Sequence, residues 1–149
     1  MKTIVLAVVF ATLILSSNIY GQEKSKDGNL AEAQLKIQIV IGKTVLSATM
    51  HNNPTTMDFL SMLPLTLKLE DYAKTEKISY LPRKLSVKDA PSGSDPSPGD
   101  ISYYSPWGNL AIFYRDFGYS NGLIILGKLD SGIELLSKYE GSIEVRLEK

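Results

Sequence analysis

The residues best suited to chemistry lie in one stretch of the chain, from Gly99 to Tyr119. It contains the only tryptophan, Trp107, and seven of the 13 aromatic residues. Pockets for small ligands combine aromatic walls with a few fixed polar groups. We therefore expect a ligand-binding site made of Tyr104, Trp107, Asn109, Phe113, Tyr114 and Arg115. The expected occupant is a small molecule or a peptide segment. The guanidinium group of Arg115 could bind a carboxylate or carbonyl of this ligand.

The aromatic stretch reads as strand, turn and strand, with Trp107 and Asn109 at the connecting turn. A period of two divides each strand between two faces. On the first strand, Ile101 and Tyr103 face one side and Ser102 and Tyr104 face the other. On the second strand, Leu110, Ile112 and Tyr114 share one face, opposite Ala111 and Phe113. A structural interpretation is also open, in which Phe113 is core, Trp107 covers one end of the fold and Arg115 pairs with a local carboxylate.

Other residues offer little for catalysis. His51 is the only histidine and there is no cysteine, so a nucleophilic triad would need His51, and a zinc site of His and Cys is excluded from this chain alone. We expect His51 to be a solvated turn residue. Asp95 and Asp100 lie in a Pro/Gly-rich loop without the spacing of a calcium loop, and such aspartates usually make turns. We expect no metal and no cofactor, and we assign no catalytic residue.

Short segments of alternating apolar and polar residues predict strands. The predicted strands are residues 35–41, 44–50, 65–69, 100–104, 110–114, 123–129 and 142–147. Two short helices are expected, at Pro54–Leu63 and Gly132–Tyr139, because Asn53 is a good N-cap and Pro54 suits the first helical position. Residues 71–80 are mixed polar, and residues 90–99 predict a long surface loop. The fold class is mainly β, a small closed barrel with two short helices, since closure removes exposed strand edges.

The first residues have the layout of a secretory signal. Lys2 supplies the positive charge, Ile4–Leu15 is an apolar run, and the residues up to Gly21 are small and polar. We predict a signal peptide at residues 1–21, a flexible leader at 22–33 and one domain at 34–149. An uncleaved anchor is the alternative, although the apolar run is shorter than the about 20 residues of a transmembrane helix. The expected location is exported, periplasmic or extracellular, with membrane contact only through the signal.

The charge balance limits the class of partner. The whole chain has 16 basic and 16 acidic residues, and the part after Gly21 carries a net charge of −1. Binding to a phosphate backbone needs a basic excess. We therefore expect no nucleic-acid partner, and a monomer.

Several segments together resemble a known family. They are Asn53–Phe59, Leu63–Leu67, Leu69–Tyr72, Glu76–Ile78, Leu81–Leu85 and the block Gly99–Tyr119 with Gly122. Their order and spacing resemble the cyclophilin-like fold proteins, which are small bacterial β-barrels similar to cyclophilin in topology. The resemblance covers the chain from about Leu35 onward and implies the fold.

The resemblance also implies one candidate activity, isomerisation of X–Pro bonds. A cyclophilin site has an Arg on a barrel strand facing a Phe-lined proline pocket, with Gln, Asn and His around it. Here no Gln follows Gln38, and His51 lies outside the aromatic block. We therefore weigh three functions: a binding module at residues 100–119, a peptidyl-prolyl isomerase, and a structural or partner-docking domain without a cleft.

Overall fold

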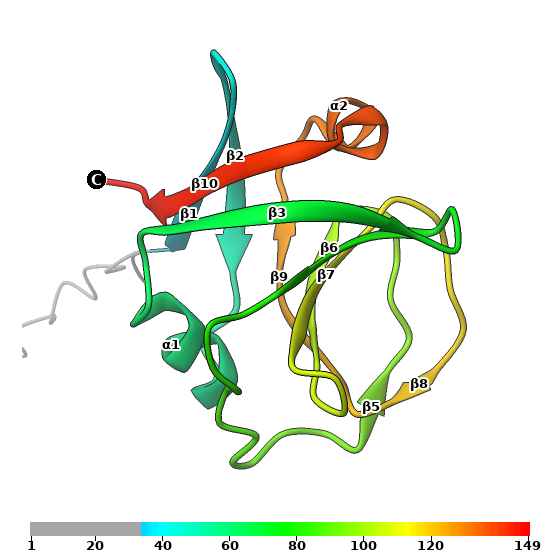
Figure 1. Cartoon of the computed structure of the whole chain (residues 1–149). Helices are drawn as coiled ribbons and strands as arrows, with labels where there is room; N and C mark the ends of the chain where they lie inside the picture. The colour runs from blue at the N-terminus through cyan, green and yellow to red at the C-terminus, as the bar shows by residue number, and fades with distance from the viewer. Residues whose placement is uncertain (1–33) are drawn as a thin grey trace, which may run out of the picture. The chain divides into compact units, whose positions relative to one another are not determined.

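The computed structural model describes residues 34–149, which form a closed antiparallel β-barrel with two short helices (Figure 1). The barrel strands are β1 (Leu35–Ile41), β2 (Thr44–Met50), β3 (Leu65–Tyr72), β4 (Glu76–Tyr80), β6 (Asp100–Tyr104), β7 (Asn109–Phe113), β9 (Leu123–Leu129) and β10 (Gly141–Leu147). The helices are α1 (Pro54–Leu60) and α2 (Ile133–Lys138), and β5 (Gly93–Ser94) pairs with β8 (Ser120–Asn121). The predicted signal peptide and leader lie outside the described residues. No helix within residues 34–149 is long and apolar enough to cross a bilayer.

The strand order around the barrel is β1-β10-β3-β4-β7-β6-β9-β2, which closes on β1. The hairpin of β1 and β2 turns at Gly42, where φ is +58°, a value that glycine adopts without steric cost. The last strand, β10, pairs with β1 on one side and with β3 on the other, and this pairing closes the barrel. The predicted closed barrel is confirmed.

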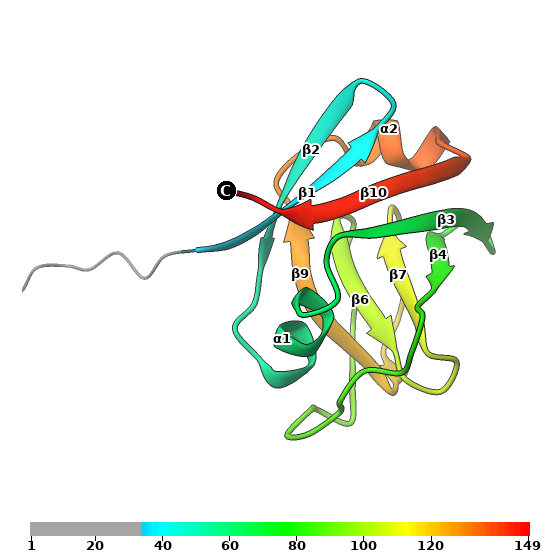
Figure 2. The ribbon, with the colours of Figure 1, turned by 60° about the vertical axis from the view of Figure 1, so that its left-hand side comes forward.

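The barrel interior is filled by alternate residues of every long strand. Ile37, Ile39, Leu126, Ile143 and Val145 are each at most 1% exposed. The two helices lie at opposite ends of the barrel, α1 below and α2 above in both ribbon views (Figure 2). Each contributes fully buried side chains to the same core, through Phe59 of α1 and Leu136 of α2.

Helix α1 begins where the sequence predicts. The Asn53 side chain accepts a hydrogen bond from the Thr56 backbone N–H at 2.9 Å, and Pro54 occupies the first turn. The helix ends at Leu60 rather than at the predicted Leu63. The chain then tightens over Met62 and Leu63, whose N–H groups bond to carbonyls three residues earlier.

Strand β4 is absent from the sequence prediction, and β3 continues to Tyr72 beyond the predicted end at residue 69. The reason is that β4 buries polar residues. Lys77 is 3% exposed and Ser79 is 6% exposed, so the strand lacks the apolar alternation that marks the others. Likewise, the predicted loop at residues 90–99 contains β5, which pairs with β8 in a small sheet.

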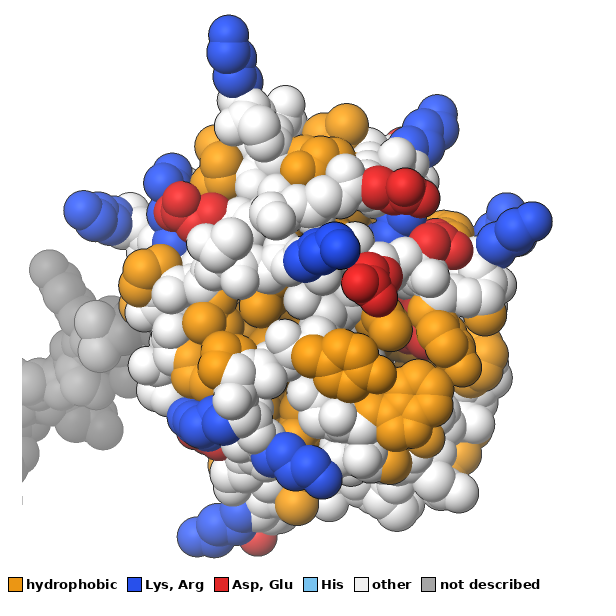
Figure 3. Space-filling view, viewed as in Figure 1, with side chains coloured by type: hydrophobic (Ala, Val, Ile, Leu, Met, Phe, Trp, Pro, Cys, Tyr) orange, Lys and Arg blue, Asp and Glu red, His pale blue; other side chains and the backbone are white. Residues whose placement is uncertain are grey.

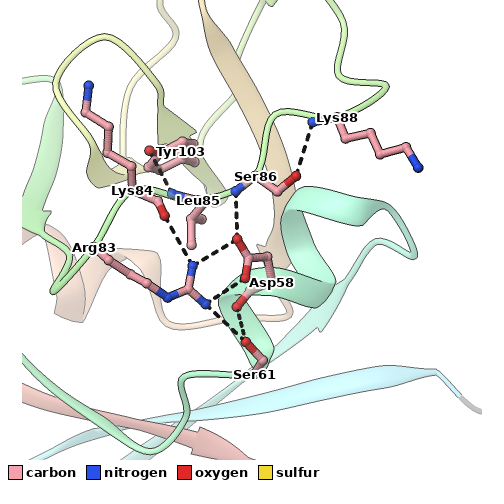
Figure 4. A network of polar contacts seen from close by, with 8 residues as sticks. All are labelled: Asp58, Ser61, Arg83, Lys84, Leu85, Ser86, Lys88 and Tyr103. Carbon is pink, nitrogen blue, oxygen red and sulfur yellow. Dashed lines mark hydrogen bonds and ion pairs between the residues drawn. The ribbon is translucent and has the colours of Figure 1, made fainter.

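The irregular segment after β4 is fastened to α1 by one carboxylate. Asp58 accepts two hydrogen bonds from the Arg83 guanidinium, at 2.6 and 3.0 Å, and a third from the Ser86 backbone N–H (Figure 4). Nearby, the Tyr103 hydroxyl accepts a hydrogen bond from the buried Leu85 N–H at 3.0 Å. These contacts hold a segment without regular structure against the barrel.

Candidate functional site

Strands β6 and β7 present two apolar faces, as the sequence predicts. Their inward residues, Ile101, Tyr103, Leu110 and Ile112, belong to the main core. Their outward residues Ala111 and Phe113 form a second, separate cluster with Ile78 and Leu123, against which Tyr104 packs. The outer wall of the barrel is therefore apolar at this place, where a solvated face would ordinarily be polar.

A small cleft lies on this outer wall and has a volume of about 180 Å³. We call it the aromatic cleft, and its lining residues are Tyr72, Glu76, Tyr104, Trp107, Asn109, Phe113, Phe117, Ser120 and Leu123. Figure 3 shows hydrophobic rings gathered around a hollow at the right of the molecule, with an acidic side chain visible between them. The cleft brings together residues from β3, β4, β6, β7, β8 and β9 and from the loops beside them.

Trp107 forms a corner of the aromatic cleft. Its ring stands at 83° to the ring of Tyr72 and at 82° to that of Tyr104, with centroids 5.5 and 5.4 Å apart. Edge-to-face pairs of this kind are favourable arrangements for aromatic rings. Nevertheless Trp107 is 47% exposed and Tyr72 is 41% exposed. The rings support one another while leaving much of their surface open to a ligand.

Gly122 allows the turn that carries Trp107 to lie close to the start of β9. Its φ is +78°, and a Cβ at this position would lie 2.9 Å from Pro106 Cδ. The Gly122 carbonyl accepts a hydrogen bond from the Ser105 N–H at 2.9 Å. A side chain here would therefore be strained by conformation and by space, and would displace the Trp107 turn.

Asn109 supplies a buried polar group to the cleft. The residue is 2% exposed, and its Nδ2 donates to the Leu110 carbonyl at 3.1 Å. Its Oδ1 is buried and accepts no hydrogen bond from any group within residues 34–149. A buried acceptor without a partner is costly, and such groups are rare unless a ligand or water satisfies them.

Glu76 supplies an ionisable group to the same cleft. Across the sheet it lies directly opposite Phe113 on β7 and Tyr72 on β3. No ion pair or hydrogen bond to its carboxylate occurs among residues 34–149. Burial without compensation raises the pKa of Glu76 to about 7.

Tyr114 and Arg115 do not join the aromatic cleft. They line a wider polar hollow with Asp71, Lys74, Lys77, Ser137, Lys138 and Glu140. The Tyr114 hydroxyl donates to Asp71 at 2.6 Å, and the buried Lys77 ammonium lies 3.1 Å from the same carboxylate oxygen. Burial, followed by the contact with Asp71, raises the pKa of Tyr114 to about 12.

The structure thus brings together four of the six sequence-predicted site residues: Tyr104, Trp107, Asn109 and Phe113. Tyr114 is separated from them because it is one residue beyond Phe113, and a step of one residue reverses the face. Arg115 is exposed beside it. The sequence-based list omits Tyr72, Glu76, Phe117, Ser120 and Leu123, which reach the cleft through barrel closure and through the 114–122 loop.

A family model described as the Cyclophilin-like family matches residues 39–148. The chain belongs to the cyclophilin-like family. It is also similar in fold to the solution structure of a hypothetical protein from Archaeoglobus fulgidus, with a TM-score of 0.56 and 12% identity over 77% of this chain and 95% of that chain. The comparison with curated proteins gives no match. The family membership and the fold predicted from the sequence are confirmed.

Within this cyclophilin-like barrel, the lining of the aromatic cleft offers ring faces, one amide group and one carboxyl group, and among the described residues it includes neither histidine nor arginine. Among residues 34–149 there is no group of three or more His, Cys, Asp or Glu side chains placed to hold a metal ion. A further hollow of about 250 Å³ lies beside His51, whose side chain is exposed.

Proposed function

We propose that this cyclophilin-like domain is a binding module and that the aromatic cleft receives a small ligand or a peptide segment. The observation that carries the proposal is the buried, unpartnered Oδ1 of Asn109 in a cleft walled by exposed rings. A shift of the Asn109 amide toward the cleft would let this oxygen accept a hydrogen bond from a ligand, which would remove the cost of its burial. The aromatic walls would supply most of the contact area.

The volume of the cleft limits what it holds. Sites for drug-sized ligands usually measure about 300–1,000 Å³, and this cleft measures about 180 Å³. It therefore suits one head group, side chain or small ring rather than a large cofactor. A peptide would place a single residue in the cleft and lie over the exposed rings on either side.

The test uses the single indole N–H signal of Trp107 in a nitrogen-15 NMR spectrum. Small molecules and short peptides are screened for compounds that shift this signal. We expect such compounds to bind the wild type. Their affinity for Asn109→Leu should be lower by about tenfold or more, since a hydrogen bond to a buried acceptor is lost.

Met57→Ala is the matched control, because Met57 is an apolar residue on α1 that is 47% exposed, as Trp107 is, and it does not line the cleft. We expect it to bind as the wild type does. A screen in which no compound shifts the indole signal, or in which Asn109→Leu binds every compound normally, would contradict the binding function.

A further inference from the structure

Among the residues that the structure describes, the aromatic cleft is lined by aromatic rings and one carboxyl group and by no basic side chain. Building on the binding function proposed above, we propose that the head group the cleft recognises is an organic cation, an alkylated ammonium group held by Trp107, Tyr72 and Tyr104 and paired with Glu76. The proposal deepens the binding function by naming the chemical class of the ligand.

The arrangement of the rings favours a rounded cation over a flat ring. A planar ligand is best held between parallel faces. Here Trp107 stands nearly perpendicular to both Tyr72 and Tyr104, so the three rings form corners rather than a stacking slot. Alkylated ammonium groups bind in such aromatic cages because the negative face of each ring attracts the positive charge.

The charge of the cleft also favours a cationic ligand. Glu76 is the one formally charged side chain among the described residues that line it, and no ion pair occupies its carboxylate. A bound cation would provide the missing partner, whereas an anionic ligand would meet a partly buried carboxylate and, among the described residues that line the cleft, no Lys or Arg. The polar hollow around Tyr114 differs in this respect, because Lys74, Lys77, Arg115 and Lys138 line it.

Asn109 adds directionality. Its Oδ1 has no partner among the described residues, and a shift of the amide toward the cleft would let it accept a hydrogen bond from an ammonium N–H, a hydroxyl or an amide N–H of the ligand. A secondary or tertiary ammonium group, or a quaternary one with a neighbouring hydroxyl, could therefore satisfy the rings, Glu76 and Asn109 together.

Cation binding should be linked to protons. Burial raises the pKa of Glu76 to about 7, so part of the free protein carries a neutral carboxylic acid at neutral pH. The other ionisable side chains facing the cleft are the phenols of Tyr72 on β3 and Tyr104 on β6. A bound cation favours the charged carboxylate and lowers its pKa. We therefore expect binding to release protons near pH 7 and to strengthen from pH 6 to pH 8.

The experiment compares choline, tetramethylammonium and dimethylethanolamine with 3,3-dimethylbutan-1-ol, the uncharged counterpart of choline. Binding is followed by Trp107 fluorescence and by its indole NMR signal in the full domain. We expect the affinity for the cations to exceed that for the neutral alcohol by about tenfold or more. Glu76→Gln should abolish most of this preference and the pH dependence.

Glu134→Gln is the matched control, because Glu134 lies on α2, outside the aromatic cleft. We expect it to bind every probe as the wild type does. Trp107→Ala should weaken all cations, with its fold checked by circular dichroism.

Two results would overturn the cation proposal while leaving the binding function standing. One is equal affinity for choline and its neutral counterpart. The other is no binding of any cation while other compounds from the screen shift the indole signal. If neither cations nor any screened compound binds, the cation proposal and the binding function both fail.

Discussion

Glu76 lies directly opposite Phe113 across the β4–β7 ladder, so an ionisable carboxyl group adjoins a residue that is 3% exposed. Tyr72 flanks Glu76 on the other side, on β3. The carboxyl group is thereby desolvated from two strands at once, which is the physical cause of its raised pKa.

Glu76→Gln should stabilise the domain at alkaline pH. The folded-state pKa is raised from 4.5 to about 7, so the folded protein binds an extra proton between these values. Stability therefore falls as pH rises through this window, and the glutamine variant avoids that loss. We expect the variant to exceed the wild type by about 2–3 kcal/mol at pH 8 and by nearly nothing at pH 4. Urea denaturation at both pH values measures the difference; a less stable variant at pH 8 would show that the carboxylate is satisfied.

Asp58→Asn should destabilise the domain by about 1–2 kcal/mol at neutral pH, since it weakens three hydrogen bonds to a charged acceptor at a partly exposed site. The contact with Arg83, followed by that with Ser86, lowers the pKa of Asp58 below 3.8. Its contribution is present above pH 4 and is lost as pH falls through the folded-state pKa. Chemical denaturation at pH 7 and pH 3 checks this. Asp95→Asn is the control, because Asp95 is an exposed carboxylate elsewhere, and it should change the unfolding free energy little. Equal stability of Asp58→Asn and the wild type at pH 7 would show that the contacts of Asp58 do not stabilise the domain.

Much of this barrel can be predicted from local patterns in the sequence. In residues 110–113, a period of two separates Leu110 and Ile112 of the main core from Ala111 and Phe113 of the second cluster. The Asn53–Pro54 cap places the start of α1 for an equally local reason. Both signals need no knowledge of distant residues.

Long-range contacts explain what local pattern misses. Lys77 points inward and is stabilised by Asp71, so β4 does not alternate in hydropathy. Glu76 and Phe117 meet Trp107 only once the barrel closes and the 114–122 loop lies over it. Conversely, Tyr114 and Arg115 adjoin Phe113 in sequence but lie in a different hollow. Adjacency along a strand does not imply a shared face.

The export of the chain remains a prediction from its first residues. Lys2 and the apolar run Ile4–Leu15 predict removal of about 21 residues by signal cleavage. N-terminal sequencing of the protein from culture medium or periplasm should begin near Gln22. Recovery of the protein in the cytosol with Met1 at its start would contradict export.

We expect X–Pro isomerase activity at background. A cyclophilin site places an arginine beside a Phe-lined pocket, whereas in the described part of the chain no arginine lines the aromatic cleft, and Arg115 lies in the polar hollow. The uncatalysed reaction takes tens of seconds or more, so weak catalysis would be visible in a protease-coupled assay with a proline peptide. Robust activity that is lost in Trp107→Ala would instead establish the isomerase function at this cleft.

Trp107→Ala distinguishes a binding role from a structural one. Trp107 is 47% exposed and makes two edge-to-face contacts, so its removal should cost about 1–2 kcal/mol of unfolding free energy. A buried large aromatic residue costs about 3–5 kcal/mol, which is the value we expect for the matched variant Phe113→Ala. Guanidinium denaturation followed by circular dichroism measures both without relying on tryptophan fluorescence. If Trp107→Ala lowers the unfolding free energy as much as Phe113→Ala does, Trp107 has a structural role. The exposure of its ring would then be no evidence for ligand binding.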